Sequence, residues 1–186
     1  MRPWITLESR YVLTQKWLKV REDHVRLPGG VELEDYYVIE YPDWVCVVCL
    51  TETGQVVLVE QYRHGVQRTT LELPAGTVDE GEDPLLAARR ELLEETGYVA
   101  DAWTSLGHCA PDPSKHTHYA HLFVASDARR VREQRLDASE VIAIRLVEPD
   151  EVLRLADSGE IVHGIHLSAL LWARHRGLLV PEGEGQ

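Results

Sequence analysis

Residues 83–97 are Asp-Pro-Leu-Leu-Ala-Ala-Arg-Arg-Glu-Leu-Leu-Glu-Glu-Thr-Gly, and this stretch decides the fold. Asp83 is a favourable N-cap residue, and Pro84 suits the first helical position because the N–H that proline lacks would be unpaired there. Gly97 suits the left-handed residue that commonly follows the last turn of a helix. The stretch therefore predicts one helix that begins after Asp83 and ends at Gly97.

Three glutamates share one face of this expected helix. Glu91 and Glu95 are four residues apart, and Glu94 is three residues from Glu91, so neighbouring Cβ atoms lie about 5–6 Å apart. Like charges at this spacing repel, and two kinds of partner can offset the repulsion. Arg90 can pair with Glu94, or divalent cations can bind, because oxygen ligands on a rigid helix suit Mg²⁺.

The spacing around the glutamates favours the cation. The pattern consists of Gly76, Glu82, Arg90-Glu91-Leu92, Glu94-Glu95 and Gly97. This pattern resembles the Nudix box, and Tyr98 is its one departure, because the box favours Ile, Leu or Val there. The chain is thus similar to Nudix hydrolases, and the resemblance implies an enzyme that cleaves a phosphoanhydride bond in a nucleoside diphosphate linked to another moiety.

The resemblance implies a set of metal ligands and catalytic groups. Glu91 and Glu95 are the implied principal ligands, Glu94 is a further ligand or the base, and the Ala75 carbonyl completes the set. The implied cofactor is Mg²⁺, or else Mn²⁺ or another divalent cation, which activates a water molecule for attack on phosphorus. The remaining box residues are expected to shape the site, and they are Gly76, Glu82, Arg90 and Gly97.

Residues outside the box resemble the ADP-ribose pyrophosphatase branch, which hydrolyses nucleoside diphosphate sugars. The likeness is carried by the segments 59–63 and 71–76. Arg63 corresponds to a family arginine that contacts substrate, and a guanidinium fork suits phosphate oxygens. Pro113 stands where the branch has a marker proline, and His118 is a second candidate substrate contact.

The Pro113 loop also departs from the branch. Ser114 and His118 stand where members specific for ADP-ribose often have glycine and glutamate. His116, His118 and His121 raise the alternative of a transition-metal site, since histidine is a common ligand. On a strand, alternation would place His116 and His118 on one face and His121 on the other, which favours substrate contact or surface roles.

Glu140 is the candidate for a glutamate that lies outside the box. Residues 139–142 precede 159–161 at the spacing that the branch shows. The resemblance implies that Glu140 is a distal metal ligand or the catalytic base. Asp137 and Glu133 are neighbours that could substitute for it.

The pattern along the rest of the chain predicts an α/β fold. The resemblance implies a Nudix α/β/α sandwich with a mixed sheet, preceded by a small N-terminal antiparallel β segment. Residues 1–42 are expected to form that segment, 43–180 the Nudix domain and 181–186 a disordered tail. Strands are expected at 44–50, 56–62, 71–73, 119–125 and 141–147, and further helices follow Pro149 and begin near Ile165.

Composition excludes several classes of protein. The chain has 186 residues and a net charge of −12, which argues against binding nucleic acid or anionic lipid. It has no apolar run of about 20 residues to span a membrane and no secretory signal, so a cytoplasmic protein is expected. Cys46 and Cys49 lie three apart in a strand, where they point to opposite faces and are expected to be core residues.

The N-terminal segment is similar to a small domain through which many relatives form dimers, so the resemblance implies a homodimer. The resemblance to Nudix hydrolases implies a nucleotide as the small-molecule substrate.

Two alternatives remain open. One is hydrolysis of another linked compound such as GDP-mannose, FAD or a dinucleoside polyphosphate. The other is a Nudix domain that senses a nucleotide without cleaving it, which the intact box glutamates disfavour.

Overall fold

The computed structural model describes residues 2–138 and 140–180, and its contacts divide the chain into two units. One unit contains Met1–Asp43 and Ala110–Tyr119, and the other contains Trp44–Cys109 and Ala120–Gln186. The sequence assigned residues 110–119 to the Nudix segment, whereas in the structure they contact the N-terminal strands. The expected disordered tail, residues 181–186, lies outside the described residues.

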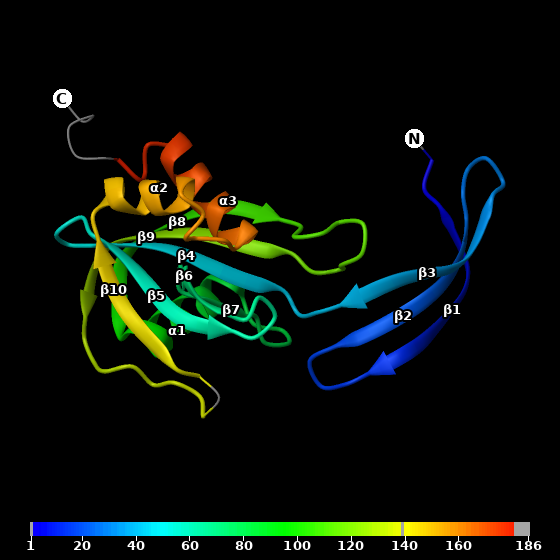
Figure 1. The fold of residues 1–186 in the computed structure, drawn as a ribbon, viewed down its shortest axis with the longest axis horizontal. Coiled ribbons are helices and arrows are strands. Elements are labelled where there is room, and N and C mark those ends of the chain that lie inside the picture. Colours follow the sequence, from blue (N-terminus) through cyan, green and yellow to red (C-terminus); the bar gives the residue numbers. More distant parts are fainter. Residues whose placement is uncertain (1, 139, 181–186) are drawn as a thin grey trace. The chain divides into compact units, whose positions relative to one another are not determined.

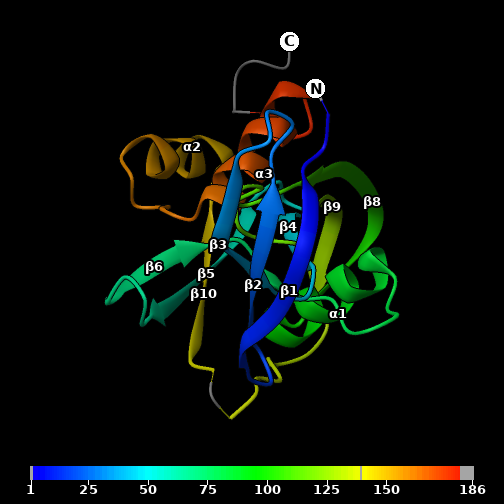
Figure 2. The same cartoon turned by 90° about the vertical axis from the view of Figure 1, so that its right-hand side faces the viewer.

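The first unit is an antiparallel sheet in the order β1-β2-β3 (Figure 2). Its strands are β1 (Ile5–Thr14), β2 (Lys19–Arg26) and β3 (Glu32–Glu40). A turn at residues 28–30 joins β2 to β3, where the N–H of Gly30 donates to the carbonyl of Leu27 at 2.9 Å. The N–H of Ile39 donates to the carbonyl of Lys115 at 2.7 Å, so the 110–119 loop is attached to β3.

The described residues of the second unit form a mixed sheet. Its strands pair in the order β10-β5-β4-β9-β8, with β6 beside β5 and β7 beside β4. β4 runs parallel to β9, while the other described pairings are antiparallel. The strands are β4 (Trp44–Thr51), β5 (Val56–Arg63), β6 (Arg68–Glu72), β7 (Ala75–Thr77), β8 (Tyr98–Cys109), β9 (Ala120–Arg130) and β10 (Ile142–Val147).

Helices cover both faces of this sheet (Figure 1). α1 (Pro84–Thr96) packs on one face, and α2 (Pro149–Asp157) and α3 (Gly164–His175) pack on the other. Cys46 belongs to the core beneath α2 and α3, and Cys49 to the core beneath α1. Both the predicted three-layer arrangement and the opposite orientation of the two cysteines are therefore confirmed. No helix among the described residues is long and apolar enough to cross a membrane.

Both predicted ends of α1 are confirmed. The carboxylate of Asp83 accepts the N–H groups of Leu85 at 2.9 Å and Leu86 at 3.2 Å. At the other end, Gly97 has a φ of 75°, and its N–H donates to the carbonyl of Leu93 at 3.0 Å. The helix that carries the three glutamates is thus fixed by hydrogen bonds at both termini.

Gly97→Ala is expected to destabilise the fold. A Cβ at this position would lie 2.0 Å from the carbonyl oxygen of Arg132, and L residues are also strained at this φ. We expect the free energy of unfolding in urea to fall by roughly 2–5 kcal/mol. Gly159→Ala has a similar φ of 77° but open space around the added carbon, so it should cost only about 1–2 kcal/mol. Equal losses in the two variants would contradict the steric argument.

Two regions differ from the expectation. β8 was not anticipated, because a bulge between Ser105 and Gly107 interrupts the two-residue alternation by which a strand is recognised. The strand expected at 119–125 is β9, which begins at Ala120 and continues to Arg130. The loop before it contains His116 and His118, so the placement of these two on a strand was wrong.

Candidate active site

The three glutamates of α1 differ in burial. The Glu95 residue is 4% exposed, while the side chains of Glu91 and Glu94 are 13% and 38% exposed. The carboxylate of Glu95 accepts the N–H of Ala75 at 3.0 Å, which ties α1 to the start of β7. Glu95 is therefore an acid held inside the protein, whereas Glu94 lies nearer the surface.

Burial is costly for the charged forms of two of these acids. It raises the pKa of Glu95 to about 8, although the hydrogen bond from the N–H of Ala75 favours the carboxylate and opposes this shift. Burial also raises the pKa of Glu91, although Arg90 opposes the shift. The charge of Glu140 raises both values further. A divalent cation would relieve this repulsion, because carboxylate oxygens are ligands that Mg²⁺ prefers.

Arg90 joins the box loop to the helix. Its guanidinium donates to Glu82 at 2.8 Å and 3.1 Å, and to the carbonyl of Thr77 at 2.9 Å. It also donates to Glu91 at 2.7 Å, whereas its contact with Glu94 is longer, at 3.5 Å. The arginine thus binds Glu82 and Glu91 more closely than Glu94, the partner that the sequence predicted.

Gly76 lies directly against the carboxylate of Glu91. A Cβ at this glycine would be 2.1 Å from the carboxyl carbon of Glu91, so any other residue would have to displace that side chain. The close approach explains in physical terms why the box has glycine here.

Gly76→Ala is expected to lower turnover while preserving the fold. The added methyl group moves only the end of a flexible side chain, so the unfolding temperature should change little. Displacing the carboxylate of Glu91 should reduce kcat by roughly 10–100-fold, as for other residues that orient a ligand. Gly29→Ala, which adds a carbon in open space, is the control. Wild-type kcat and metal activation in Gly76→Ala would exclude a role for the position of Glu91.

Arg63, at the end of β5, forms a bidentate ion pair with Glu72. The two nitrogen–oxygen distances are 2.8 Å and 2.6 Å, and the side chain of Glu72 is 1% exposed. Burial alone would raise the pKa of Glu72, but the hydrogen bonds from Arg63 and Thr70 outweigh it and the pKa is lowered. Arg63 is partly exposed and is influenced by the charges of Glu95 and Glu140, so it can face an anion near them.

A pocket of about 400 Å³ lies beside Arg63. Its lining is Trp44, Arg63, His64, Gly65, Val66, Thr70, Glu72, Val162, His163 and Gly164. Glu72 and His163 were not singled out from the sequence. The one signal for Glu72 was an acid between two leucines in a short strand, a position where the side chain is buried and needs a partner.

Histidines support one wall of this pocket. The rings of His163 and Trp44 stack with centroids 6.1 Å apart, and His163 also stacks on His166 at 4.3 Å. The Nδ1 of His166 accepts the N–H of Leu73 at 3.2 Å. Burial lowers the pKa of His166 to about 3, so its ring is neutral at physiological pH.

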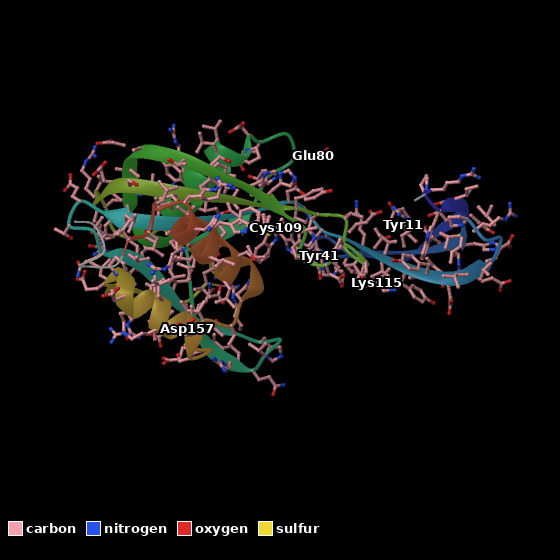
Figure 3. The ribbon with its side chains drawn as sticks, turned by 90° about the horizontal axis from the view of Figure 1, so that it is seen from above. Tyr11, Tyr41, Glu80, Cys109, Lys115 and Asp157 are labelled. Atoms are coloured by element: carbon pink, nitrogen blue, oxygen red, sulfur yellow. The ribbon has the colours of Figure 1, made fainter. Side chains whose placement is uncertain are left out.

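Pro113 and His118 belong to the first unit, whereas α1 belongs to the second. Burial lowers the pKa of His118, whose ring lies 5.5 Å from that of Tyr41 and 5.3 Å from that of His116. Tyr41 and Lys115, in the same unit, are labelled in Figure 3. The predicted substrate contacts are therefore split between the two units.

Glu140 lies in the segment between β9 and β10 and is exposed. Its carboxylate accepts the N–H of Asp137 at 3.0 Å, and its own N–H donates to the carbonyl of Asp137 at 2.9 Å. The turn thus holds the Glu140 side chain locally, within electrostatic reach of Glu91 and Glu95.

The donor chemistry of the site fits a divalent cation. Glu91 and Glu95 supply hard oxygen atoms near the start of β7, where Glu95 bonds the backbone of Ala75. Arg90 does not fully offset the cost of their charged forms, because the pKa of Glu91 remains raised. In residues 2–138 and 140–180, no group of three or more His, Cys, Asp or Glu side chains is already gathered as a metal site. The carboxylates are instead held by Arg90 and the N–H of Ala75, so ligands would have to reorient around an ion.

Two domain families match the chain. The NUDIX domain matches residues 40–165, and the nucleoside diphosphate sugar hydrolase N-terminal domain matches residues 4–39. A solved structure described as an ADP compounds hydrolase has a similar fold. The TM-score is 0.83 at 22% identity, and the match covers 96% of this chain and 98% of that one.

Curated relatives agree with these families. The ADP-ribose pyrophosphatase of Bacillus subtilis is 31% identical over 84% of each chain. The ADP-ribose pyrophosphatase of Mycobacterium tuberculosis is 32% identical over 89% of this chain and 81% of its own. A CMP-5'-(N-acetyl-N-hydroxy-3-aminopropyl)phosphonate hydrolase of Streptomyces rubellomurinus is 30% identical over 86% and 76%. This chain therefore belongs to the Nudix hydrolase family, in its nucleoside diphosphate sugar branch.

Proposed function

We propose that this protein is a Mg²⁺-dependent hydrolase of ADP-ribose or a similar nucleoside diphosphate sugar. It cleaves the pyrophosphate to give a nucleoside monophosphate and a sugar phosphate. The observation that carries the proposal is the buried Glu95 beside Glu91 on α1, two carboxyl groups whose charged forms are destabilised by burial and would be stabilised by a divalent cation. The ADP-ribose pyrophosphatases of Bacillus subtilis and Mycobacterium tuberculosis, which are relatives of this chain, support the class of substrate.

Glu91, Glu95 and Glu94, with the carbonyl of Ala75, would hold the cation. Glu140 would serve as a distal ligand or as the base. A bound divalent cation supplies a more acidic water molecule and offsets negative charge on the phosphate oxygens. The donors are all oxygen atoms, which suits Mg²⁺ or Mn²⁺.

The chain's own residues perform the remaining steps. One of the carboxylates of Glu94, Glu95 and Glu140 accepts a proton from the attacking water. The water oxygen forms a bond to one phosphorus, and the bond between that phosphorus and the bridging oxygen breaks. The guanidinium of Arg63 binds a phosphate oxygen and stabilises the charge that develops there. Pro113 and His118 remain predicted substrate contacts.

A substrate panel with identified products tests the proposal. We expect Mg²⁺-dependent release of AMP and ribose phosphate from ADP-ribose, or of the corresponding pair from another nucleoside diphosphate sugar. The panel includes GDP-mannose, FAD, dinucleoside polyphosphates and nucleoside triphosphates. These are needed because the phosphonate hydrolase of Streptomyces rubellomurinus, a relative with a different activity, is 30% identical to this chain. Turnover restricted to dinucleotides or triphosphates would overturn the substrate class.

Calorimetry addresses the alternative of a non-catalytic sensor. A sensor would bind a nucleotide in the presence of Mg²⁺ and leave it intact through prolonged incubation. The hydrolase that we propose converts its ligand under the same conditions. Chromatography of the calorimeter contents separates the two outcomes.

We also propose that two copies associate through the N-terminal sheet. β1 is exposed along its whole length and carries Ile5, Leu7, Tyr11, Val12 and Leu13. Exposed apolar strands on a sheet edge favour pairing with another chain. A cytoplasmic location stays a prediction.

Light scattering should give twice the mass of one chain at micromolar concentration. Ile5→Lys places a charge on β1 and should shift the protein towards the monomer. Leu171→Lys makes the same change at an exposed apolar residue of α3 and should leave the dimer intact. A monomeric unmodified chain would refute the association.

A further inference from the structure

The end of α1 receives hydrogen bonds from the segment that follows β9. A helix leaves its last four carbonyl groups without partners inside the helix. The N–H of Arg135 donates to the carbonyl of Glu94 at 2.8 Å, and the side-chain amide of Gln134 donates to the carbonyl of Glu95 at 2.6 Å. These two residues thus bond the backbone of the same positions whose side chains are the proposed ligands.

The amide of Gln134 makes a second bond. It donates to the carbonyl of Ile142, the first residue of β10, at 3.2 Å. One partly buried amide therefore connects α1, the beginning of the loop that leads to Glu140, and the strand that follows this loop. Glu140 is six residues after Gln134 and two before Ile142, so both ends of its loop meet at this amide.

The turn around Glu140 needs such an anchor. The two hydrogen bonds between Asp137 and Glu140 fix the turn internally. They do not fix its position relative to α1, which depends on contacts at the ends of the loop. Gln134 supplies a contact at each end, and the backbone it bonds on α1 belongs to Glu95.

We propose that Gln134 is a positioning residue that sets where Glu140 is presented to the glutamates of α1. The inference rests on the proposed function, in which Glu140 acts as a distal ligand or base. Gln134 itself touches neither substrate nor cation. Its side chain acts by holding the loop, and removal of its two hydrogen bonds should release Glu140 from the position in which it works.

A double-mutant cycle tests this role. Gln134→Met retains a side chain of similar length but cannot donate either hydrogen bond. It is combined with Glu140→Gln, and kcat and the Mg²⁺ activation curve are measured on the substrate that the panel identifies. We expect Gln134→Met to lower kcat by roughly 10–100-fold, as supporting residues of a metal site do. In the Glu140→Gln background, the same substitution should have no further effect, because the group it positions is already lost.

The metal-free protein provides a readout that does not depend on activity. Hydrogen–deuterium exchange of residues 135–142 should become faster in Gln134→Met, while the exchange rates of α1 should not change. Gln55→Met is the matched control. It removes a surface hydrogen bond to Glu148 and should change neither kcat nor exchange in this loop.

Three kinetic results would overturn the inference while leaving the proposed hydrolase intact. They are wild-type kcat in Gln134→Met, effects of the two substitutions that multiply in the double variant, and wild-type kcat in Glu140→Gln. Unchanged exchange of residues 135–142 would also overturn it. If the unmodified chain hydrolyses no nucleoside diphosphate sugar with any divalent cation, the proposed function has failed and the inference falls with it.

Discussion

Glu95→Gln is expected to reduce turnover by more than about 100-fold, which exceeds the roughly 10–100-fold effect of residues that merely support a ligand. The amide removes the charge that would bind the cation. It nevertheless keeps an oxygen that can accept the N–H of Ala75, so the protein should still fold. Steady-state kinetics with a Mg²⁺ titration measures the effect. Glu80→Gln, an equivalent change in the loop before α1, is the control (Figure 3).

The same variant should be more stable than the wild type in metal-free, alkaline solution. The folded pKa of Glu95, about 8, lies above its ordinary value of 4.5, so folding favours the protonated acid. The stability that this proton contributes is complete below pH 4.5 and is lost as the pH rises through 8. At about 1.4 kcal/mol per pH unit, the wild type should lose a few kcal/mol over this window relative to Glu95→Gln.

Urea unfolding of both proteins at pH 5 and pH 9, with chelator present, measures this difference. A difference between the two proteins that does not change with pH would contradict the raised pKa of the buried Glu95. Wild-type turnover in Glu95→Gln would remove this residue from the metal site. The two results are independent, so the electrostatic description and the catalytic assignment can fail separately.

Arg63→Ala should affect both stability and catalysis. It leaves the carboxylate of Glu72 buried without its ionic partner, which typically costs about 3–5 kcal/mol of unfolding free energy. It also removes the guanidinium that we propose binds phosphate, and kcat/KM should fall by roughly 10–100-fold beyond any loss of folded protein. Urea unfolding and steady-state kinetics measure the two effects.

A compensating variant separates these two roles. Glu72→Gln in the Arg63→Ala background removes the unpaired charge and should recover most of the stability without restoring kcat/KM. Arg63→Lys keeps the charge but loses the bidentate geometry, so its kcat/KM should be intermediate. Recovery of kcat/KM together with stability in the double variant would mean that Arg63 has only a structural role.

The sequence predicted α1 and the layers around it because their signals are local. The termini of α1 depend on Asp83 and Gly97, and both act within one turn of the helix. The opposite orientations of Cys46 and Cys49 follow from the two-residue period of a strand alone. Local rules of this kind hold wherever the rest of the chain packs.

The sequence did not predict features that depend on distant contacts. The ion pair of Arg63 with Glu72 joins neighbouring strands. The wall of His163 and His166 comes from α3 and the N-cap residue before it. Spacing along the chain does not contain this information. The capping of α1 by Gln134 is likewise a contact over 39 residues, and no helix rule identifies its donor in advance.

The metal dependence of the unmodified protein tests the central claim most directly. We expect metal-free protein to leave ADP-ribose and related nucleoside diphosphate sugars intact. Adding Mg²⁺ should release one nucleoside monophosphate and one sugar phosphate per molecule of at least one of them, and chelation should stop the release. Hydrolysis at the same rate with chelator present, or no hydrolysis of any of these compounds with Mg²⁺ or Mn²⁺, would contradict the account.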